Sequence, residues 1–169
     1  MARPFDPATV PARRVLLQAQ IIHGALCAGL FSFGVVAFFI GGSDSVDTQL
    51  PEETLRLLPL VAGGLTALTA LPAMLLTGRF AARNLSDEHF DPGLRAQRYL
   101  FSRIICAAMI EGPGLFWGVI SFLSGDPLHL AGLGFCLFAL LSTLPRAAEW
   151  EDAGFDLDRS LTGERLDEV

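Results

Sequence analysis

The sequence predicts an all-α integral membrane protein with four transmembrane helices, arranged as two hairpins with both termini in the cytoplasm. Hydrophobic residues make up 51% of the 169 residues and charged residues only 18%, against about a quarter in soluble domains. The charged residues leave four long apolar stretches, which together cover half of the chain. A soluble domain of this length could not bury that much apolar helix, because its surface is too large for its volume.

Each of the four predicted spans is a long apolar stretch. Residues 15–40 contain no Asp, Glu, Lys or Arg, and 26 such residues exceed the ~20 that are needed to cross a ~30 Å hydrocarbon core. The second, third and fourth spans are expected at about residues 57–77, 104–123 and 128–144. The fourth has 17 residues, which is the short end of the range that can cross a bilayer.

Arginine residues set the predicted orientation of the 15–146 bundle. They occur in the N-terminal arm, residues 1–14, and in the long loop, residues 78–103, whereas the loop at 41–56 carries four acids and one arginine. Because arginines close to span ends stay on the cytoplasmic side, we expect both termini and the long loop in the cytoplasm. An even number of spans agrees with this orientation.

An internal repeat supports the two-hairpin arrangement. Residues 21–42 and 104–125 share eight identical positions at an offset of 83 residues. Such a repeat predicts that spans 1–2 and spans 3–4 are equivalent hairpins, related by an axis along the membrane normal.

The C-terminal segment, residues 147–169, carries eight acids and two arginines, with Trp150 and other apolar residues scattered among them. This composition predicts a solvated acidic tail in the cytoplasm. The apolar residues favour the alternative, in which the tail docks onto a protein partner. Besides the lipid bilayer, we therefore expect either a protein partner at the tail or a second copy of the chain, and no nucleic acid.

The candidate site is a polar layer within the spans, formed by Glu111, His23 and Thr69. Glu111 lies eight residues past Arg103, or ~12 Å into the membrane at 1.5 Å per residue. A charged side chain costs several kcal/mol at this depth, so the carboxyl group is either protonated or has a partner. His23 and Thr69 are expected at the same depth, where an imidazole and a carboxylate could share a proton. In the alternative, His23 and Thr69 bond the backbone or each other and only hold the helices together.

The three residues that follow Glu111 predict a helix break. Pro113 cannot donate a backbone hydrogen bond, and Gly112 and Gly114 lower the cost of distorting the helix. An acid beside a break near the membrane midplane is typical of the discontinuous helices of transporters.

The stretch Glu111–Ile120 resembles the carboxylate helix of rotary ATPase proteolipid subunits, in which an acid precedes small residues, an aromatic residue, a glycine and aliphatic residues. The resemblance covers about twenty of the 169 residues and implies that Glu111 binds an ion. It departs from that family because the acid lies on the first helix of its hairpin and not on the second. The four-span pattern also resembles small uncharacterised bacterial integral membrane proteins. This resemblance implies a fold and a place in the bacterial inner membrane, but it does not indicate an activity.

The sequence carries no motif for catalysis, cofactor binding or metal binding. Its three histidines lack H-x-x-x-H spacing, its three cysteines lack C-x-x-C spacing, and no P-loop or dinucleotide fingerprint occurs. We therefore expect no enzyme, no cofactor and no metal, and favour a non-enzymatic membrane component or partner-binding subunit. The alternative is a proton- or ion-coupled transporter or channel component in which Glu111 titrates.

Overall fold

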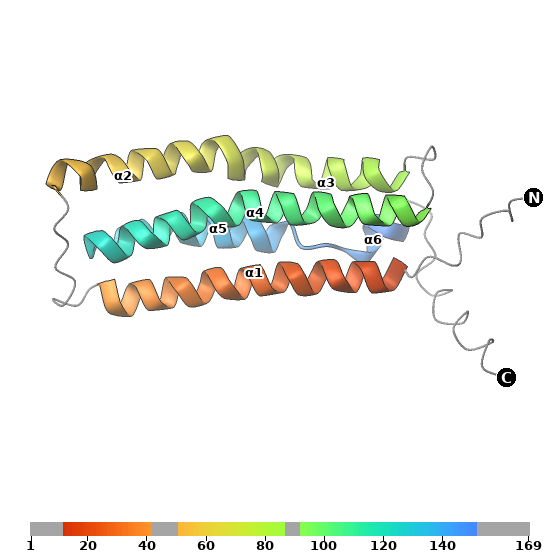
Figure 1. Ribbon diagram of the computed structural model, residues 1–169, viewed down its shortest axis with the longest axis horizontal. Helices are drawn as coiled ribbons and strands as arrows, with labels where there is room; N and C mark the ends of the chain where they lie inside the picture. The colour runs from red at the N-terminus through yellow and green to blue at the C-terminus, as the bar shows by residue number, and fades with distance from the viewer. Residues whose placement is uncertain (1–11, 42–50, 87–91, 152–169) are drawn as a thin grey trace, which may run out of the picture.

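The computed structural model describes residues 12–41, 51–86 and 92–151, and every element in these ranges is helical (Figure 1). The first half holds α1 (Ala12–Gly41), α2 (Glu52–Leu65), the π-helix η2 (Thr66–Ala70) and α3 (Leu71–Ser86). The second half holds α4 (Pro92–Ser124), the 3-10 helix η3 (Pro127–His129), α5 (Leu130–Ser142) and α6 (Ala147–Glu151). Most of the predicted N-terminal arm and acidic tail lies outside the described residues.

Three helical segments are long and apolar enough to cross a membrane, namely Arg13–Gly41, Glu53–Arg79 and Gly93–Ser124. They contain the first three predicted spans, so the expectation of several apolar helices long enough to span a membrane is confirmed. The fourth apolar segment, Pro127–Ser142, is shorter. The 13 residues of α5 reach only ~20 Å at 1.5 Å per residue, which is less than the ~30 Å of a hydrocarbon core.

The helices lie side by side as an elongated bundle (Figure 1). α1 and α4 run in the same direction, and the continuous segment α2–η2–α3 runs back in the opposite direction. α4 is central, because α1, α3 and α5 all pack against it. α5 also packs on α1, and after it ends the chain continues along the bundle to α6.

Two glycines of α4 permit the close approach of its neighbours. A Cβ atom at Gly114 would lie 2.9 Å from side-chain atoms of both Leu30 on α1 and Cys136 on α5. At Gly118 it would lie 2.6 Å from the ring of Phe33. Small residues at these positions let the helix backbones meet, which is how helices pack in a lipid environment where apolar burial alone gives little attraction.

The predicted break at Gly112, Pro113 and Gly114 is wrong, because α4 continues through these residues as one helix. A break at this depth would leave several backbone groups without partners, whereas Pro113 within a continuous helix leaves only one carbonyl unbonded. Helical geometry changes elsewhere, in the π-helix η2 and in the non-helical connection, residues 143–146, between α5 and α6.

Candidate functional site

Two members of the predicted polar layer are hydrogen-bonded to the backbone. His23 is buried on α1, and its Nε2 atom lies 2.7 Å from the carbonyl oxygen of Leu140 on α5, a contact in which Nε2 carries the proton. Thr69 lies in η2, and its hydroxyl donates to the carbonyl oxygen of Leu65 at 2.8 Å. His23 therefore links α1 to α5, and Thr69 bonds within its own helical segment.

Glu111, the third member, is half-buried at the edge of the exposed face of α4. Gly112 and Leu115 next to it are exposed, whereas Ile110 is fully buried. The carboxyl group lies within electrostatic range of the thiol of Cys27 on α1. Among the described residues no hydrogen bond or ion pair holds this carboxyl group, so the structure does not bring the three predicted residues into one bonded network.

A separate polar chain joins α4 to η2 and η3. The indole Nε1 of Trp117 donates to the hydroxyl of Thr66 at 3.0 Å, and that hydroxyl donates to the carbonyl of Ala62 at 2.8 Å. The Trp117 ring stacks on His129 with 6.1 Å between centroids, and His129 Nδ1 lies 3.0 Å from the hydroxyl of Ser124. These contacts join three helical segments, so the chain holds helices together.

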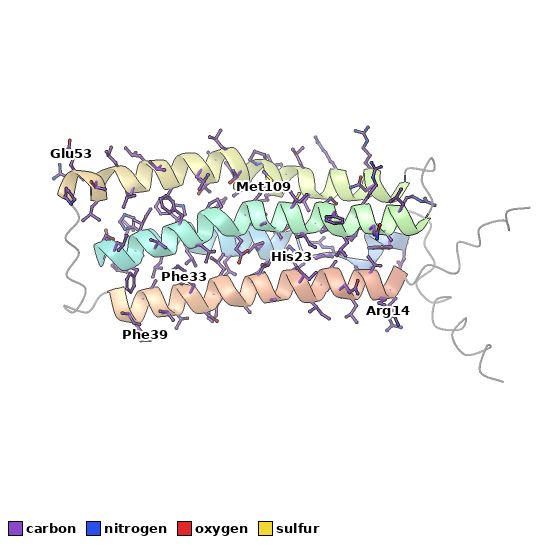
Figure 2. All side chains as sticks on the ribbon, viewed as in Figure 1. Arg14, His23, Phe33, Phe39, Glu53 and Met109 are labelled. Atoms are coloured by element: carbon purple, nitrogen blue, oxygen red, sulfur yellow. The ribbon has the colours of Figure 1, made fainter. Side chains whose placement is uncertain are left out.

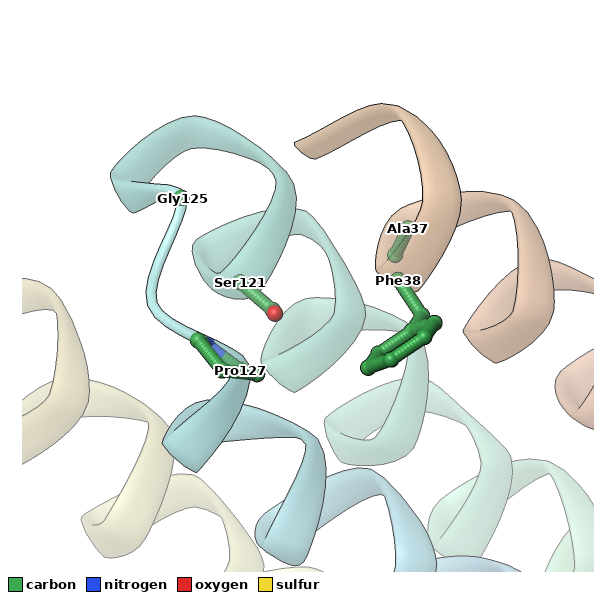
Figure 3. A pocket seen from close by; sticks show the side chains of 5 residues that line it. All are labelled: Ala37, Phe38, Ser121, Gly125 and Pro127. Carbon is green, nitrogen blue, oxygen red and sulfur yellow. The ribbon is translucent and has the colours of Figure 1, made fainter. Parts of the chain in front are cut away.

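A pocket of about 220 Å³ lies at the same end of the bundle, between the end of α1 and the turn from α4 to η3 (Figure 3). Its lining residues are Ala37, Phe38, Ser121, Gly125 and Pro127. Ser121 carries the polar side chain of this set, and its hydroxyl donates to the carbonyl oxygen of Asp126 at 3.1 Å. The pocket is therefore an apolar crevice without a free polar side chain to bind a ligand.

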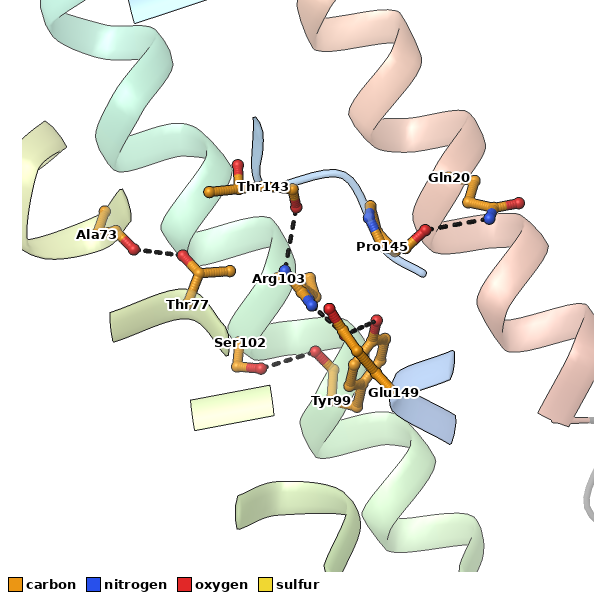
Figure 4. Close-up of polar contacts among 9 residues, drawn as sticks. All are labelled: Gln20, Ala73, Thr77, Tyr99, Ser102, Arg103, Thr143, Pro145 and Glu149. Atoms are coloured by element: carbon orange, nitrogen blue, oxygen red, sulfur yellow. Dashed lines mark hydrogen bonds and ion pairs between the residues drawn. The ribbon is translucent and has the colours of Figure 1, made fainter. Parts of the chain in front are cut away.

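Arg103 lies at the opposite end of the bundle in a group of residues that we call the Arg103 cluster, consisting of Tyr99, Arg103, Glu149 and Trp150. Figure 4 shows the polar contacts of Tyr99, Arg103 and Glu149. The guanidinium group forms an ion pair with Glu149 of α6, and Nη1 donates to the carbonyl oxygen of Thr143 at 3.0 Å. The hydroxyl of Tyr99 donates to the same carboxylate at 3.0 Å. Arg103 is only 3% exposed, so its charge depends on these partners.

Trp150 anchors α6 beside this ion pair. Its indole is fully buried, and its ring meets the Tyr99 ring edge to face at 4.9 Å between centroids. The other buried residues around it are Leu16, Ala19 and Ala96. Gln20 of α1 donates to the carbonyl oxygen of Pro145 at 3.1 Å, which satisfies part of the non-helical connection. Helix α6, which forms the first five residues of the predicted acidic tail, is therefore held on the bundle through Glu149 and Trp150.

Sequence reasoning did not find the Arg103 cluster. It placed Arg103 at a membrane boundary and assigned Trp150 to a segment that could dock onto another protein. The pair joins positions 46 residues apart, and no sequence periodicity connects them. The signal that could have revealed this cluster is the pair Glu149 and Trp150, just after the fourth predicted span. An acid beside an aromatic residue is suited to burial against a cation.

Comparison with models of known protein families, with curated proteins and with solved structures finds no match to this chain. The class of protein therefore rests on the chain itself, whose three long apolar helices indicate a helical membrane protein. Within the described ranges, no group of three or more His, Cys, Asp and Glu side chains could hold a metal ion.

Proposed function

We propose that the protein is a four-span component of the bacterial inner membrane that binds a second membrane-embedded polypeptide. Three of the spans correspond to α1, α2–η2–α3 and α4. The fourth begins with η3 and α5 and ends near residue 144, after which the chain continues along the bundle to α6 (Figure 1).

The distribution of charge supports an orientation with both termini in the cytoplasm. Arg14 lies at one end of the bundle and Glu53 at the other (Figure 2). The end with Arg14 also holds the exposed arginines Arg83 and Arg98. Arginines close to span ends stay on the cytoplasmic side of the membrane.

The observation that carries partner binding is the state of Glu111. Its carboxyl group lies at the edge of a lipid-facing surface with no hydrogen bond among the described residues. An acidic charge at the centre of a transmembrane helix costs about 2.5–3.5 kcal/mol on insertion scales. A helix of another polypeptide that carries a hydroxyl, amide or cationic group would offset this cost. The exposed small residues Ala108 and Gly112 beside it let such a helix approach closely.

The contacts of the other two polar residues favour binding over transport. The proton relay expected from the sequence needs an imidazole that shares a proton with the carboxyl group of Glu111. His23 and Thr69, the groups predicted for that role, bond the carbonyl oxygens of Leu140 and Leu65 instead.

Native mass spectrometry of the full chain in a mild detergent tests the proposal. We expect a second polypeptide at fixed stoichiometry with the wild type and with Glu111→Gln, whose amide still forms hydrogen bonds. Glu111→Leu should weaken this association by about tenfold or more, which corresponds to ~1.4 kcal/mol. Leu115→Ala, on the same exposed face, is the control for lost apolar contact. A wild-type protein without a second polypeptide, or full retention of it by Glu111→Leu, would contradict the proposal.

A liposome assay separates this proposal from the transport alternative. We expect no proton flux above that of empty liposomes for the wild type. A flux that Glu111→Gln abolishes would identify a transporter and overturn partner binding as the role of this carboxyl group.

A further inference from the structure

We propose that the outer face of η2 and α3 holds one anionic phospholipid, in the leaflet from which α3 emerges, with Arg79 binding the phosphate group. The proposal concerns a different surface from Glu111 and does not depend on a protein partner. It rests on a groove of suitable depth, on the backbone that shapes this groove and on the charge at its end.

The groove has a volume of about 410 Å³, and five of its six lining residues are apolar. The apolar lining residues are Ala67, Leu71, Pro72, Leu75 and Leu76, and the sixth lining residue is Arg79. Arg79 is the first charged residue after the apolar stretch 57–78, so it marks the polar end of the groove. From Arg79 to Ala67 the helix rises by ~18 Å, close to the ~15 Å thickness of half a hydrocarbon core. One acyl chain of a single leaflet would therefore fit along the groove.

The local backbone explains why this face is shaped in this way. The π-helix Thr66–Ala70 inserts an extra residue into the turn, and Pro72 follows it without a backbone donor. Both features bend helices, and the α2–α3 segment bends where η2 lies (Figure 1). Ala67 adds little side-chain volume at the deep end, which leaves room for a lipid tail.

The charge at the shallow end favours an anionic headgroup. Arg79 is exposed, and among the described residues no hydrogen bond or ion pair engages its guanidinium group. Arg83 lies one turn further along α3 and is also exposed, so a second positive charge is on the same side. An arginine at this depth extends its apolar stem along the groove and directs its guanidinium group to the headgroup region. In the headgroup region the guanidinium group matches the geometry of a phosphate group. A lipid with net negative charge would balance the positive charges of Arg79 and Arg83.

Lipid titration of the delipidated full chain, followed by native mass spectrometry, tests the site. The probes are phosphatidylglycerol and phosphatidylcholine with identical acyl chains. We expect the wild type to bind one phosphatidylglycerol more tightly than phosphatidylcholine. Arg79→Gln should weaken phosphatidylglycerol binding about fivefold. It should weaken phosphatidylcholine binding by a smaller factor, because that lipid carries the same phosphate group but no net negative charge.

Two further variants separate the site from general attraction to the surface. Arg13→Gln removes the same charge at the same end of the bundle, but on α1, which lies on the other side of α4 (Figure 1). We expect no effect from it. Ala67→Trp fills the deep end of the groove and should weaken the binding of both lipids. Equal loss in Arg13→Gln and Arg79→Gln, no loss in Arg79→Gln, or equal binding of the two lipids by the wild type would overturn the proposal.

Discussion

The ion pair between Arg103 and Glu149 makes a quantitative prediction about how the C-terminal segment is held. In Glu149→Gln the buried guanidinium group loses its counter-charge and keeps only neutral partners, among them the carbonyl oxygen of Thr143 and the ring of Tyr99. Its Nε atom is already buried without a hydrogen bond. Removing one member of a buried pair costs about 3–5 kcal/mol, because an uncompensated charge remains in the interior.

The structure places the expected loss at the low end of this range. Arg103 is 3% exposed but Glu149 is 25% exposed, so water screens one side of the pair. We therefore expect Glu149→Gln to lower the unfolding free energy by about 3 kcal/mol. For a chain of this size, that corresponds to a fall in Tm of roughly 6–12 °C in detergent. The control is Glu151→Gln, an exposed acid on the same helix, which should change Tm by no more than about 1–2 °C.

The double variant Arg103→Leu with Glu149→Leu tests the reasoning independently of the single changes. Replacing both charges by apolar residues removes the cost of burying them, so the double variant should recover most of the stability that Glu149→Gln loses. Hydrogen exchange of residues 143–151 should rise in Glu149→Gln and fall again in the double variant. An unchanged Tm in Glu149→Gln, or a double variant that is less stable than the single one, would refute the argument.

Four further substitutions test other contacts by thermal unfolding, three in detergent and one in nanodiscs. Gly118→Ala should lose about 1–3 kcal/mol, because its Cβ would lie 2.6 Å from a phenyl ring, whereas Gly112→Ala, with nothing within 4 Å, should be neutral or gain up to about 1 kcal/mol. Equal effects would show that α1 does not pack on α4 in this way. Trp117→Phe should cost about 1 kcal/mol through the lost hydrogen bond to η2, and an unchanged Tm would contradict that contact. Glu111→Leu in nanodiscs should raise the Tm of the isolated protein, because the carboxyl group lacks a partner; a fall would show that it is bonded within the chain.

The positions of the long helices could be predicted from the sequence because transfer into lipid is a local property of each residue. The charge-free stretch 15–40 lies within α1, and the predicted span 104–123 lies within α4. Hydropathy and length decide such segments without knowledge of their neighbours. The same reasoning predicted a fourth span at 128–144, with the shortest apolar stretch of the four. The apolar helix found there is shorter than the other three, so the fourth span stays a prediction.

The helix break was predicted wrongly for a reason that is also physical. The glycine and proline content of residues 112–114 indicates how easily the backbone can distort. Whether it does distort depends on how the neighbouring helices pack against these residues. Gly114 is packed against Leu30 and Cys136, and this packing holds α4 in a continuous helix. The π-helix η2 carries no proline or glycine at all, so nothing in its composition indicated the change in geometry.

Side-chain partners were decided by the tertiary structure alone. Successive residues of a helix point about 100° apart, so a shift of one residue between neighbouring helices changes every contact. Depth along the membrane placed Glu111, His23 and Thr69 in one layer, but rotation about the helix axes directs His23 to Leu140 and leaves Glu111 at the lipid-facing edge. Arg103 and Glu149 meet because the chain after α5 runs along α4. The length of an apolar stretch does not predict this course of the chain. Local solvation therefore determines where this chain enters the membrane, and the register between helices determines which of its polar groups are paired.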